Sequence, residues 1–277
     1  MFLRSIWQTY VTDLREETEA ASKRYRAETP LGVIDRRVAV VLLTAMICLV
    51  AVRFFGAERD SDWIAKSLDA IGLDTLSKRA AAALGPAPGN RFNLRIFWAV
   101  ARVVFYALIP LLVIRFALRD GIRHFGVRAR GILAHGRVYA ILLAIIAPFV
   151  VAASYGASFQ SKYPYYRLTP GEPLWPFFWG WEALYALQFA ALEFFFRGFM
   201  VHGLKLPLGY ASIFVMMVPY TMIHLGKPLP EAVGSIIAGF VLGTLSLKSG
   251  SIWWGVVVHV TVAGSMDLIS LWRQGLL

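Results

Sequence analysis

Residues 190–199 read Ala-Ala-Leu-Glu-Phe-Phe-Phe-Arg-Gly-Phe and place two charges, Glu193 and Arg197, inside a strongly apolar run. At a spacing of four residues the two side chains share one face of a helix. A charge at bilayer depth costs about 2.5–3.5 kcal/mol on insertion scales. A chain that keeps two such charges there pairs them, uses them, or does both. The segment therefore predicts a membrane helix that carries either a structural ion pair or part of a buried polar site.

The composition of the whole chain is that of a polytopic membrane protein. Of its 277 residues 58% are hydrophobic, and the apolar residues gather in long runs. The net charge of +11 would favour nucleic-acid binding in a soluble protein. Here the basic residues lie mostly beside apolar runs, where they anchor and orient spans, so we expect no nucleic-acid partner. The single cysteine, Cys48, excludes an intrachain disulfide and a cysteine-based zinc site.

We predict an all-α fold, a transmembrane helical bundle of about seven to eight spans. An eighth span would have to be hidden in the polar region 56–92, where Trp63, Ile64, Leu68 and Ile71 predict a short amphipathic helix. The Gly239/Gly243 pair permits close helix packing. The seven expected spans are 38–55, 95–117, 138–155, 174–203, 207–225, 230–247 and 251–272.

Three regions are expected along the chain. Residues 1–37 form a charged amphipathic segment, too charged for an ordinary signal peptide. Residues 38–124 form an N-terminal transmembrane region with a polar loop, and residues 125–277 form a C-terminal core. The basic stretch 115–137 is placed in the cytoplasm by the positive-inside rule, together with the N-terminus. These features predict a multi-pass protein of the cell membrane, with a bacterial inner membrane favoured.

Five polar residues lie in the last four expected spans: Glu182, Glu193, Arg197, His224 and His259. A glutamate and two histidines on different helices are compatible with a metal site or with water activated by a carboxylate–imidazole pair. The absence of an HExxH motif disfavours the metal site. Each residue also has a structural interpretation. His224 could be an interfacial histidine at a helix end, His259 could bond across helices, and Glu182 could pair with Arg102 or lie near the outer surface.

One feature of this topology is in tension with a shared site. Glu193 and His259 lie towards the inner half of the membrane, whereas His224 ends a helix that runs outward. We therefore expect the fifth span to be short or to enter a cavity, with irregular backbone at 227–230. Glu231 would then be a further polar cavity residue.

Three segments in this order resemble a known family. They are Glu193-Phe194-Phe195-Phe196-Arg197-Gly198, Tyr220-Thr221-Met222-Ile223-His224, and His259 in a tryptophan-rich last helix. They resemble the CPBP family, the CAAX prenyl endopeptidase and bacteriocin-processing (Abi) membrane proteins, which are glutamate-type intramembrane proteases. The resemblance covers roughly 125–272.

The resemblance implies an all-helical membrane core with a polar cavity. It implies that Glu193 and His224 activate water against a peptide carbonyl, that His259 stabilises the oxyanion, and that Arg197 sets the electrostatics of Glu193. Two positions depart from the family pattern. Leu192 stands where a first glutamate is usual, and Ala263 where an asparagine is usual. Neighbouring helix positions point about 100° apart, so Glu193 does not simply replace that first glutamate unless a π-bulge re-aims it.

The leading interpretation is an intramembrane endopeptidase that acts on a membrane-anchored or lipidated protein within the lipid bilayer, with no cofactor and no catalytic metal. The alternative is a catalytically inactive scaffold of the same family that holds a partner membrane protein. A third interpretation, a small transporter or proton relay, rests on the buried charges. The absence of repeat symmetry in the sequence counts against this third interpretation.

Overall fold

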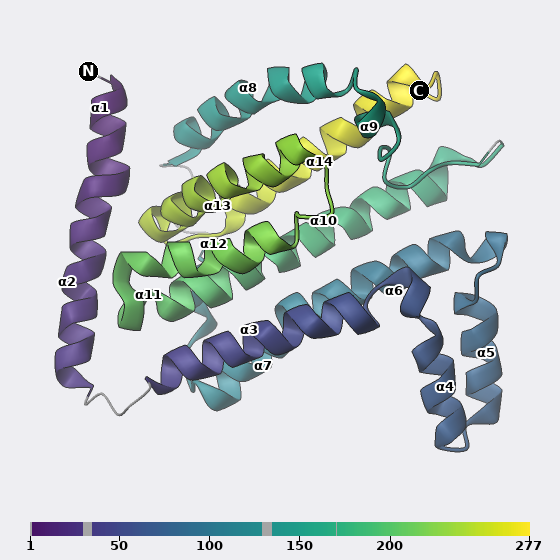
Figure 1. Cartoon of the computed structure of the whole chain (residues 1–277), viewed down its shortest axis with the longest axis horizontal. Helices are drawn as coiled ribbons and strands as arrows, with labels where there is room; N and C mark the ends of the chain where they lie inside the picture. The colour runs from purple at the N-terminus through teal and green to yellow at the C-terminus, as the bar shows by residue number, and fades with distance from the viewer. Residues whose placement is uncertain (1, 30–34, 129–134, 170) are drawn as a thin grey trace.

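The computed structural model describes residues 2–29, 35–128, 135–169 and 171–277, and its elements are helical apart from turns and one isolated bridge between Val127 and Ser251. Figure 1 shows a bundle of long helices with α1–α2 standing across one end and the α4–α5 hairpin at the other. The predicted all-α transmembrane bundle is confirmed. Six segments of the described residues are long and apolar enough to cross a membrane.

The first half of the chain supplies two spans and a polar hairpin between them. The N-terminal segment holds α1 (Phe2–Trp7), the π-helical η1 (Gln8–Thr12) and α2 (Asp13–Glu28). The first span is α3 (Arg36–Phe55), which is followed by η2 (Glu58–Asp60), α4 (Asp62–Ala70), α5 (Asp74–Leu84) and η3 (Pro88–Asn90). The second span runs through α6 (Arg91–Val103), η4 (Val104–Leu108), α7 (Ile109–Leu112) and η5 (Val113–Ala117).

The second half carries the remaining spans. After η6 (Ile122–Phe125) come α8 (Gly136–Ala153) and α9 (Ala157–Gln160). A continuous helical run then passes through η8 (Leu174–Phe178), α10 (Trp179–Glu193), η9 (Phe194–His202), α11 (Gly203–Leu208), η10 (Gly209–Ala211) and α12 (Ser212–Met222). The last two spans are α13 (Leu229–Ser249) and α14 (Trp253–Arg273).

The 49-residue run Leu174–Met222 contains both the fourth and the fifth predicted spans. Gly209 has a φ of 59°, which a residue with a Cβ rarely adopts, and the chain turns back there so that α12 lies beside η9. At 11 residues α12 is about 17 Å long, well short of a hydrocarbon core of about 30 Å. The expectation of a short fifth span is confirmed. The irregular backbone that follows this span covers 223–228, so it begins earlier than the predicted 227–230 and ends before Leu229 and Pro230, which already belong to α13.

The region 56–92 holds no eighth span among its described residues. The predicted amphipathic helix is α4, and α5 packs against it as a second short helix. The Gly239/Gly243 pair behaves as predicted. A Cβ at Gly239 would lie 3.1 Å from Met217 Cγ, and one at Gly243 would lie 3.0 Å from Ile213 Cγ2, so α12 approaches α13 closely.

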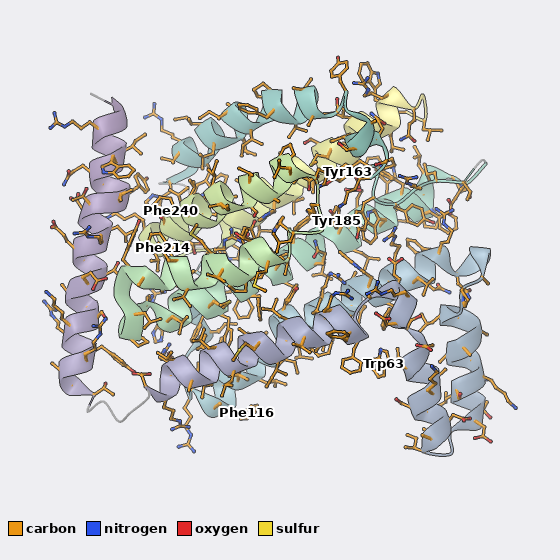
Figure 2. All side chains as sticks on the ribbon, in the orientation of Figure 1. Trp63, Phe116, Tyr163, Tyr185, Phe214 and Phe240 are labelled. Atoms are coloured by element: carbon orange, nitrogen blue, oxygen red, sulfur yellow. The ribbon has the colours of Figure 1, made fainter. Side chains whose placement is uncertain are left out.

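The core is a cluster of buried aromatic and aliphatic side chains around η9. Phe195, Phe196 and Phe199 are fully buried there against α3, η4 and α12. Aromatic residues also spread along the bundle. In Figure 2, Phe214 and Phe240 lie nearer to α2 than Tyr163 and Tyr185 do. The residues that follow Glu193 are therefore central to the packing.

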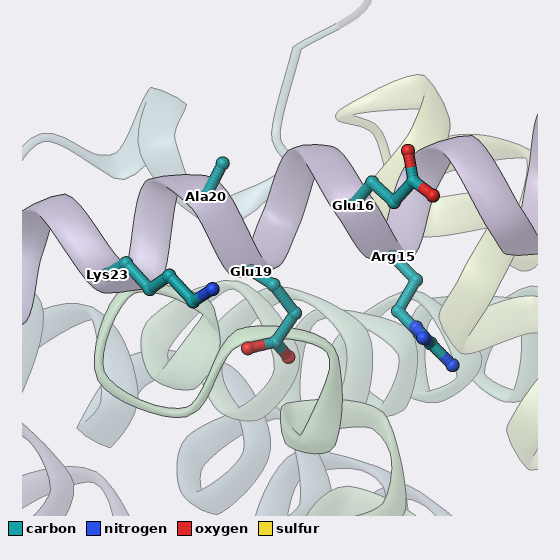
Figure 3. Close-up of a pocket in the computed structure, with 5 residues that line it drawn as sticks. All are labelled: Arg15, Glu16, Glu19, Ala20 and Lys23. Carbon is teal, nitrogen blue, oxygen red and sulfur yellow. The ribbon is translucent and has the colours of Figure 1, made fainter.

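The helix α2 covers the end of the bundle at which the chain reverses between α11 and α12. Oε1 of Glu19 accepts a hydrogen bond from the backbone N–H of Tyr210 at 3.1 Å, and Nε of Arg26 donates to the carbonyl oxygen of Pro207 at 3.0 Å. Figure 3 shows a shallow surface pocket along α2, in which Glu19 turns toward the reversing loop. This segment is thus a helix docked on the ends of other helices, while its amphipathic character stays a prediction.

Candidate functional site

Glu193 is the last residue of α10, and its side chain is completely buried. Oε1 lies 2.9 Å from Nη1 of Arg197, which is also completely buried. Two charges withdrawn from solvent in this way must compensate each other, since an isolated buried charge is far more costly than a buried pair. The helical spacing seen in the sequence therefore becomes an ion pair in the centre of the bundle.

The helix changes type immediately after Glu193. The nine residues of η9, Phe194–His202, form a π-helix, in which backbone hydrogen bonds run from residue i to i+5, and every one of them is buried. Gly198 is required in this segment because a Cβ there would lie 2.8 Å from the carbonyl oxygen of Phe125. Short π-helical segments are frequent at functional sites. A wide turn at this point changes the direction of the side chains that follow Glu193.

Arg197 connects three helices around this carboxylate. Its Nη2 donates to the carbonyl oxygen of Ala238 on α13 at 3.4 Å. Its Cζ lies 4.1 Å from the ring centroid of Tyr220 on α12, a cation–π contact. Nε has no hydrogen-bond partner among the described residues. The guanidinium is therefore held in place by contacts with α12 and α13 as well as by Glu193.

His259 reaches the same carboxylate from α14. Its Nδ1 lies 2.7 Å from Oε1 of Glu193, an ion pair whenever the imidazole is protonated, although the ring N–H is not aligned for a hydrogen bond. Its Nε2 lies 3.2 Å from the hydroxyl of Tyr220. The ring also stacks on Phe189, with 5.3 Å between centroids and 5° between planes. Three contacts thus fix the orientation of the imidazole.

His224 lies in the turn that follows α12, at the edge of the group formed by Glu193, Arg197 and His259. Its Nδ1 lies 2.8 Å from the carbonyl oxygen of Tyr220, and its ring centroid lies 4.9 Å from that of Tyr220. Burial, followed by the nearby positive charge of Lys227, lowers the pKa of His224 to about 4. The imidazole is therefore neutral near pH 7. With Nδ1–H donating to the carbonyl, Nε2 is left as a free base. Because α12 is short, it ends at the same depth in the bundle as His259. The difference in depth between His224 and His259 that the sequence led us to expect is therefore absent.

One oxygen of the central carboxylate has no hydrogen-bond partner in the described part of the chain. Oε2 of Glu193 is buried, and it points at Gly255 of α14, where a Cβ would lie only 2.3 Å away. A buried carboxylate oxygen without a donor is costly, so such an oxygen is a natural acceptor for a water or substrate proton. Because Gly255 has no side chain, it leaves the space that this oxygen occupies.

The two positions that depart from the family pattern both lie in apolar clusters. Leu192 is 8% exposed and packs in the central apolar cluster around η9. Ala263 packs with Tyr166, Trp181 and Tyr185, further along α14. Both small apolar side chains are therefore part of the hydrophobic packing.

Glu182 does not pair with Arg102, which corrects one of the two alternatives from the sequence. Nη1 of Arg102 donates to the carbonyl oxygens of Gly56 and Trp98, and its guanidinium lies over the Trp98 ring. Glu182 instead lies beside Asp267 of α14, a buried carboxyl group that accepts a hydrogen bond from the backbone N–H of Tyr165 at 2.9 Å. Asp267 was missed in the sequence, where its position inside an apolar run was the available signal.

Tyr220 is the second residue that sequence reasoning missed, although it lies in the quoted motif. It contacts Arg197, His224 and His259 and so joins the two histidines. Glu231, expected as a further cavity residue, instead pairs with Lys227 at 3.3 Å and accepts from the hydroxyl of Tyr163. Among the described residues no group of three or more His, Cys, Asp and Glu side chains is arranged to hold a metal ion.

Residues 173–264 match the family described as type II CAAX prenyl endopeptidase Rce1-like. The match contains Glu193, Arg197, His224 and His259, and it confirms the resemblance expected from the sequence. The comparisons with curated proteins and with solved structures return no match. The matched segment runs from η8 into α14, so it covers the helices that build the site.

Proposed function

We propose that this chain, a member of the Rce1-like family through residues 173–264, is an intramembrane endopeptidase that hydrolyses a peptide bond in a membrane-anchored or lipidated protein. The observation that carries the proposal is the arrangement around one buried carboxylate. Oε1 of Glu193 is held by Arg197 and faces His259, while Oε2 is buried and unpartnered. A carboxylate fixed in this way can accept a proton from a water molecule.

In the proposed reaction Glu193 and the neutral imidazole of His224 orient a water molecule and take its proton. The resulting hydroxide oxygen bonds to the carbonyl carbon of the substrate, and the C–N bond breaks as the proton passes to the leaving nitrogen. Arg197 keeps Glu193 ionised and in place by its 2.9 Å contact. The reaction written this way needs no electrons from a cofactor.

His259 is proposed to stabilise the oxyanion of the tetrahedral intermediate. Its Nε2 lies 3.2 Å from the hydroxyl oxygen of Tyr220, and this contact holds the ring in a fixed orientation beside the carboxylate of Glu193. A single donor of this kind supplies about 2.7–4 kcal/mol in other oxyanion holes. Ala263 cannot add a second donor from the position where the family usually has an asparagine.

The reaction is proposed to run without a metal ion. A metal ion at this site would need ligands in addition to the three nearby side chains Glu193, His224 and His259. The expected result is that chelators leave hydrolysis by the purified, reconstituted protein unchanged. Loss of hydrolysis on chelation, with recovery specifically on addition of zinc, would contradict this part of the proposal.

The experiment that tests the whole proposal compares peptide termini in membranes of host cells. One strain carries the wild-type chain and one carries Glu193→Gln at matched abundance. The control is Glu182→Gln, which makes the same change on the same helix and keeps a hydrogen-bonding group beside Asp267. We expect a set of specific termini in the wild type and in the control that disappears in Glu193→Gln.

A second candidate function is favoured by Leu192, which packs in the apolar core where a catalytic glutamate is usual. On this alternative the chain is an inactive scaffold of the same family that binds a partner membrane protein. Identical termini in the wild-type and Glu193→Gln strains, together with a defect in a deletion strain, would establish the scaffold and refute the protease.

A further inference from the structure

A basic pocket lies at the end of the bundle opposite α2. Its volume is about 530 Å³, and four cations line it: Arg91, Arg95, Lys162 and Arg167. They come from the start of α6 and from the loop between α9 and η8. Figure 1 shows this end beside the α4–α5 hairpin and the C-terminus.

Only one of these cations has a carboxylate partner within the described residues. Arg95 pairs with Glu58 at 2.6 Å. Arg91 donates to the carbonyl oxygen of Arg167, Arg167 donates to that of Ser161, and Lys162 reaches that of Gly226 at 3.5 Å. Glu172 also lies near Arg91, but its carboxylate is engaged by Tyr166 and Thr169. The pocket therefore concentrates positive charge that the protein itself does not neutralise.

Membrane topology does not account for this charge. The positive-inside rule explains basic residues at the cytoplasmic ends of spans, and the basic residues between 115 and 128 lie at and after the far end of the span that begins at Arg91. On the orientation expected from the sequence, the four cations lie on the outer side and require another reason. A negatively charged ligand that binds at this depth would explain the four cations.

The depth of the pocket relative to the bilayer indicates which kind of molecule would carry that negative charge. Large aromatic side chains are exposed at the same end of the spans, and such residues mark the level of the lipid headgroups. Arg91 and Arg95 belong to the first turns of a membrane-spanning helix, so their guanidinium groups lie at that level too. The exposed aromatic residues are Tyr155, Trp175, Trp179 and Trp272.

We propose that this pocket binds the phosphate headgroup of an anionic phospholipid from the leaflet on this side. Arginine presents five N–H donors in a planar fork that suits phosphate oxygens, and Arg91 and Arg167 each spend one on a backbone carbonyl. Basic pockets between transmembrane helices are suited to lipid headgroups on electrostatic grounds. The proposal is independent of the proteolytic activity, because it concerns binding alone.

The test is native mass spectrometry of the delipidated full-length protein titrated with phosphatidylglycerol, and separately with phosphatidylcholine. The double variant Arg91→Gln/Arg167→Gln is compared with Lys78→Gln/Arg79→Gln, which removes two exposed cations of α5 outside the pocket. Lys162→Gln serves as a milder pocket variant because the contact of Lys162 with the carbonyl oxygen of Gly226 is long, at 3.5 Å. A parallel arm adds inorganic phosphate as competitor.

We expect the wild type to bind phosphatidylglycerol about tenfold more tightly than phosphatidylcholine, a ratio in line with the attraction of a few basic residues to anionic lipid. The pocket variants should lose most of this preference, and the α5 variant should keep it. Equal binding of the two lipids, or equal loss in pocket and α5 variants, would overturn the proposal. Complete displacement by inorganic phosphate would overturn the lipid assignment in favour of a free-phosphate site.

Discussion

The imidazole of His259 lies 2.7 Å from the carboxylate of Glu193, measured from Nδ1 to Oε1, and this contact joins α14 to the end of α10. The same oxygen lies 2.9 Å from Arg197. One buried carboxylate oxygen is thus shared between a permanent cation and a titratable ring. The stability and the chemistry of the site depend on this shared oxygen, so both can be tested by changing its neighbours.

Replacing Arg197 with methionine should destabilise the protein strongly. Glu193 would remain buried without its permanent counter-charge, and breaking a buried pair in this way costs about 3–5 kcal/mol. The double variant Glu193→Gln/Arg197→Met removes both charges and should be more stable than Arg197→Met alone. Thermal unfolding in detergent measures all three proteins. A double variant no more stable than Arg197→Met would show that the pair does not compensate.

Replacing Tyr220 with phenylalanine should reduce hydrolysis far more than stability. The change removes the hydroxyl that lies 3.2 Å from Nε2 of His259 but keeps the ring under Arg197. Loss of one hydrogen bond costs about 0.5–1.5 kcal/mol of unfolding free energy. The matched control is Tyr210→Phe, which removes a buried hydroxyl contact with Thr244 outside the site. Equal effects of both variants on hydrolysis would refute a role for Tyr220 in orienting His259.

Gly255 and Gly234 should respond in opposite ways to alanine. A Cβ at Gly255 would overlap Oε2 of Glu193 at 2.3 Å, so Gly255→Ala should displace the carboxylate and remove activity. A Cβ at Gly234 on α13 has no neighbour within 4 Å, so Gly234→Ala should be neutral or stabilising by up to about 1 kcal/mol. Melting temperature and hydrolysis are measured for both. Full activity in Gly255→Ala would mean that Oε2 is not needed where it lies.

Acid should destabilise the wild type through His224. Burial and Lys227 lower the pKa of His224 to about 4, whereas an unfolded histidine has a pKa of about 6.5. Between these values the unfolded state binds more protons, so stability falls as the pH falls from about 6.5 to about 4. His224→Gln lacks this contribution. The difference in melting temperature between the two proteins should therefore change across that window and stay constant above it.

The same shift predicts the acidic limit of hydrolysis. A base with its pKa lowered to about 4 stays neutral at pH 5, so the activity of the wild type should hold down to about that pH. The rate is measured across this range in reconstituted vesicles. An acidic limb centred between pH 6 and 7 would argue that another group serves as the base.

Much of the fold could be predicted because long apolar runs determine membrane helices. The runs that became α3, α8, α13 and α14 were predicted with nearly their observed bounds. The i, i+4 spacing of Glu193 and Arg197 likewise predicted their pairing, since both residues lie on one helix. The predicted division of the chain at residue 124 and the cytoplasmic side of 115–137 stay predictions.

Contacts between helices were harder to predict, because they depend on how each helix is rotated and how deep it sits. The pairing of Glu182 with Asp267 and the contact of Tyr220 with His259 are of this kind. The π-helix after Glu193 has no clear sequence signal either. Its residues, Phe195 and Phe196 among them, are buried in the central apolar cluster.

The shortness of α12 has a consequence for the membrane around the protein. Its Phe214, Val218 and Met222 side chains are exposed on one face at intervals of four residues, so lipid chains lie against a helix about half as long as the bilayer core is thick. The bilayer must thin beside this helix, at a modest free-energy cost for each ångström of mismatch. Acyl-chain length should thereby set the rate at which this protein works, independently of the amino-acid sequence of its substrate.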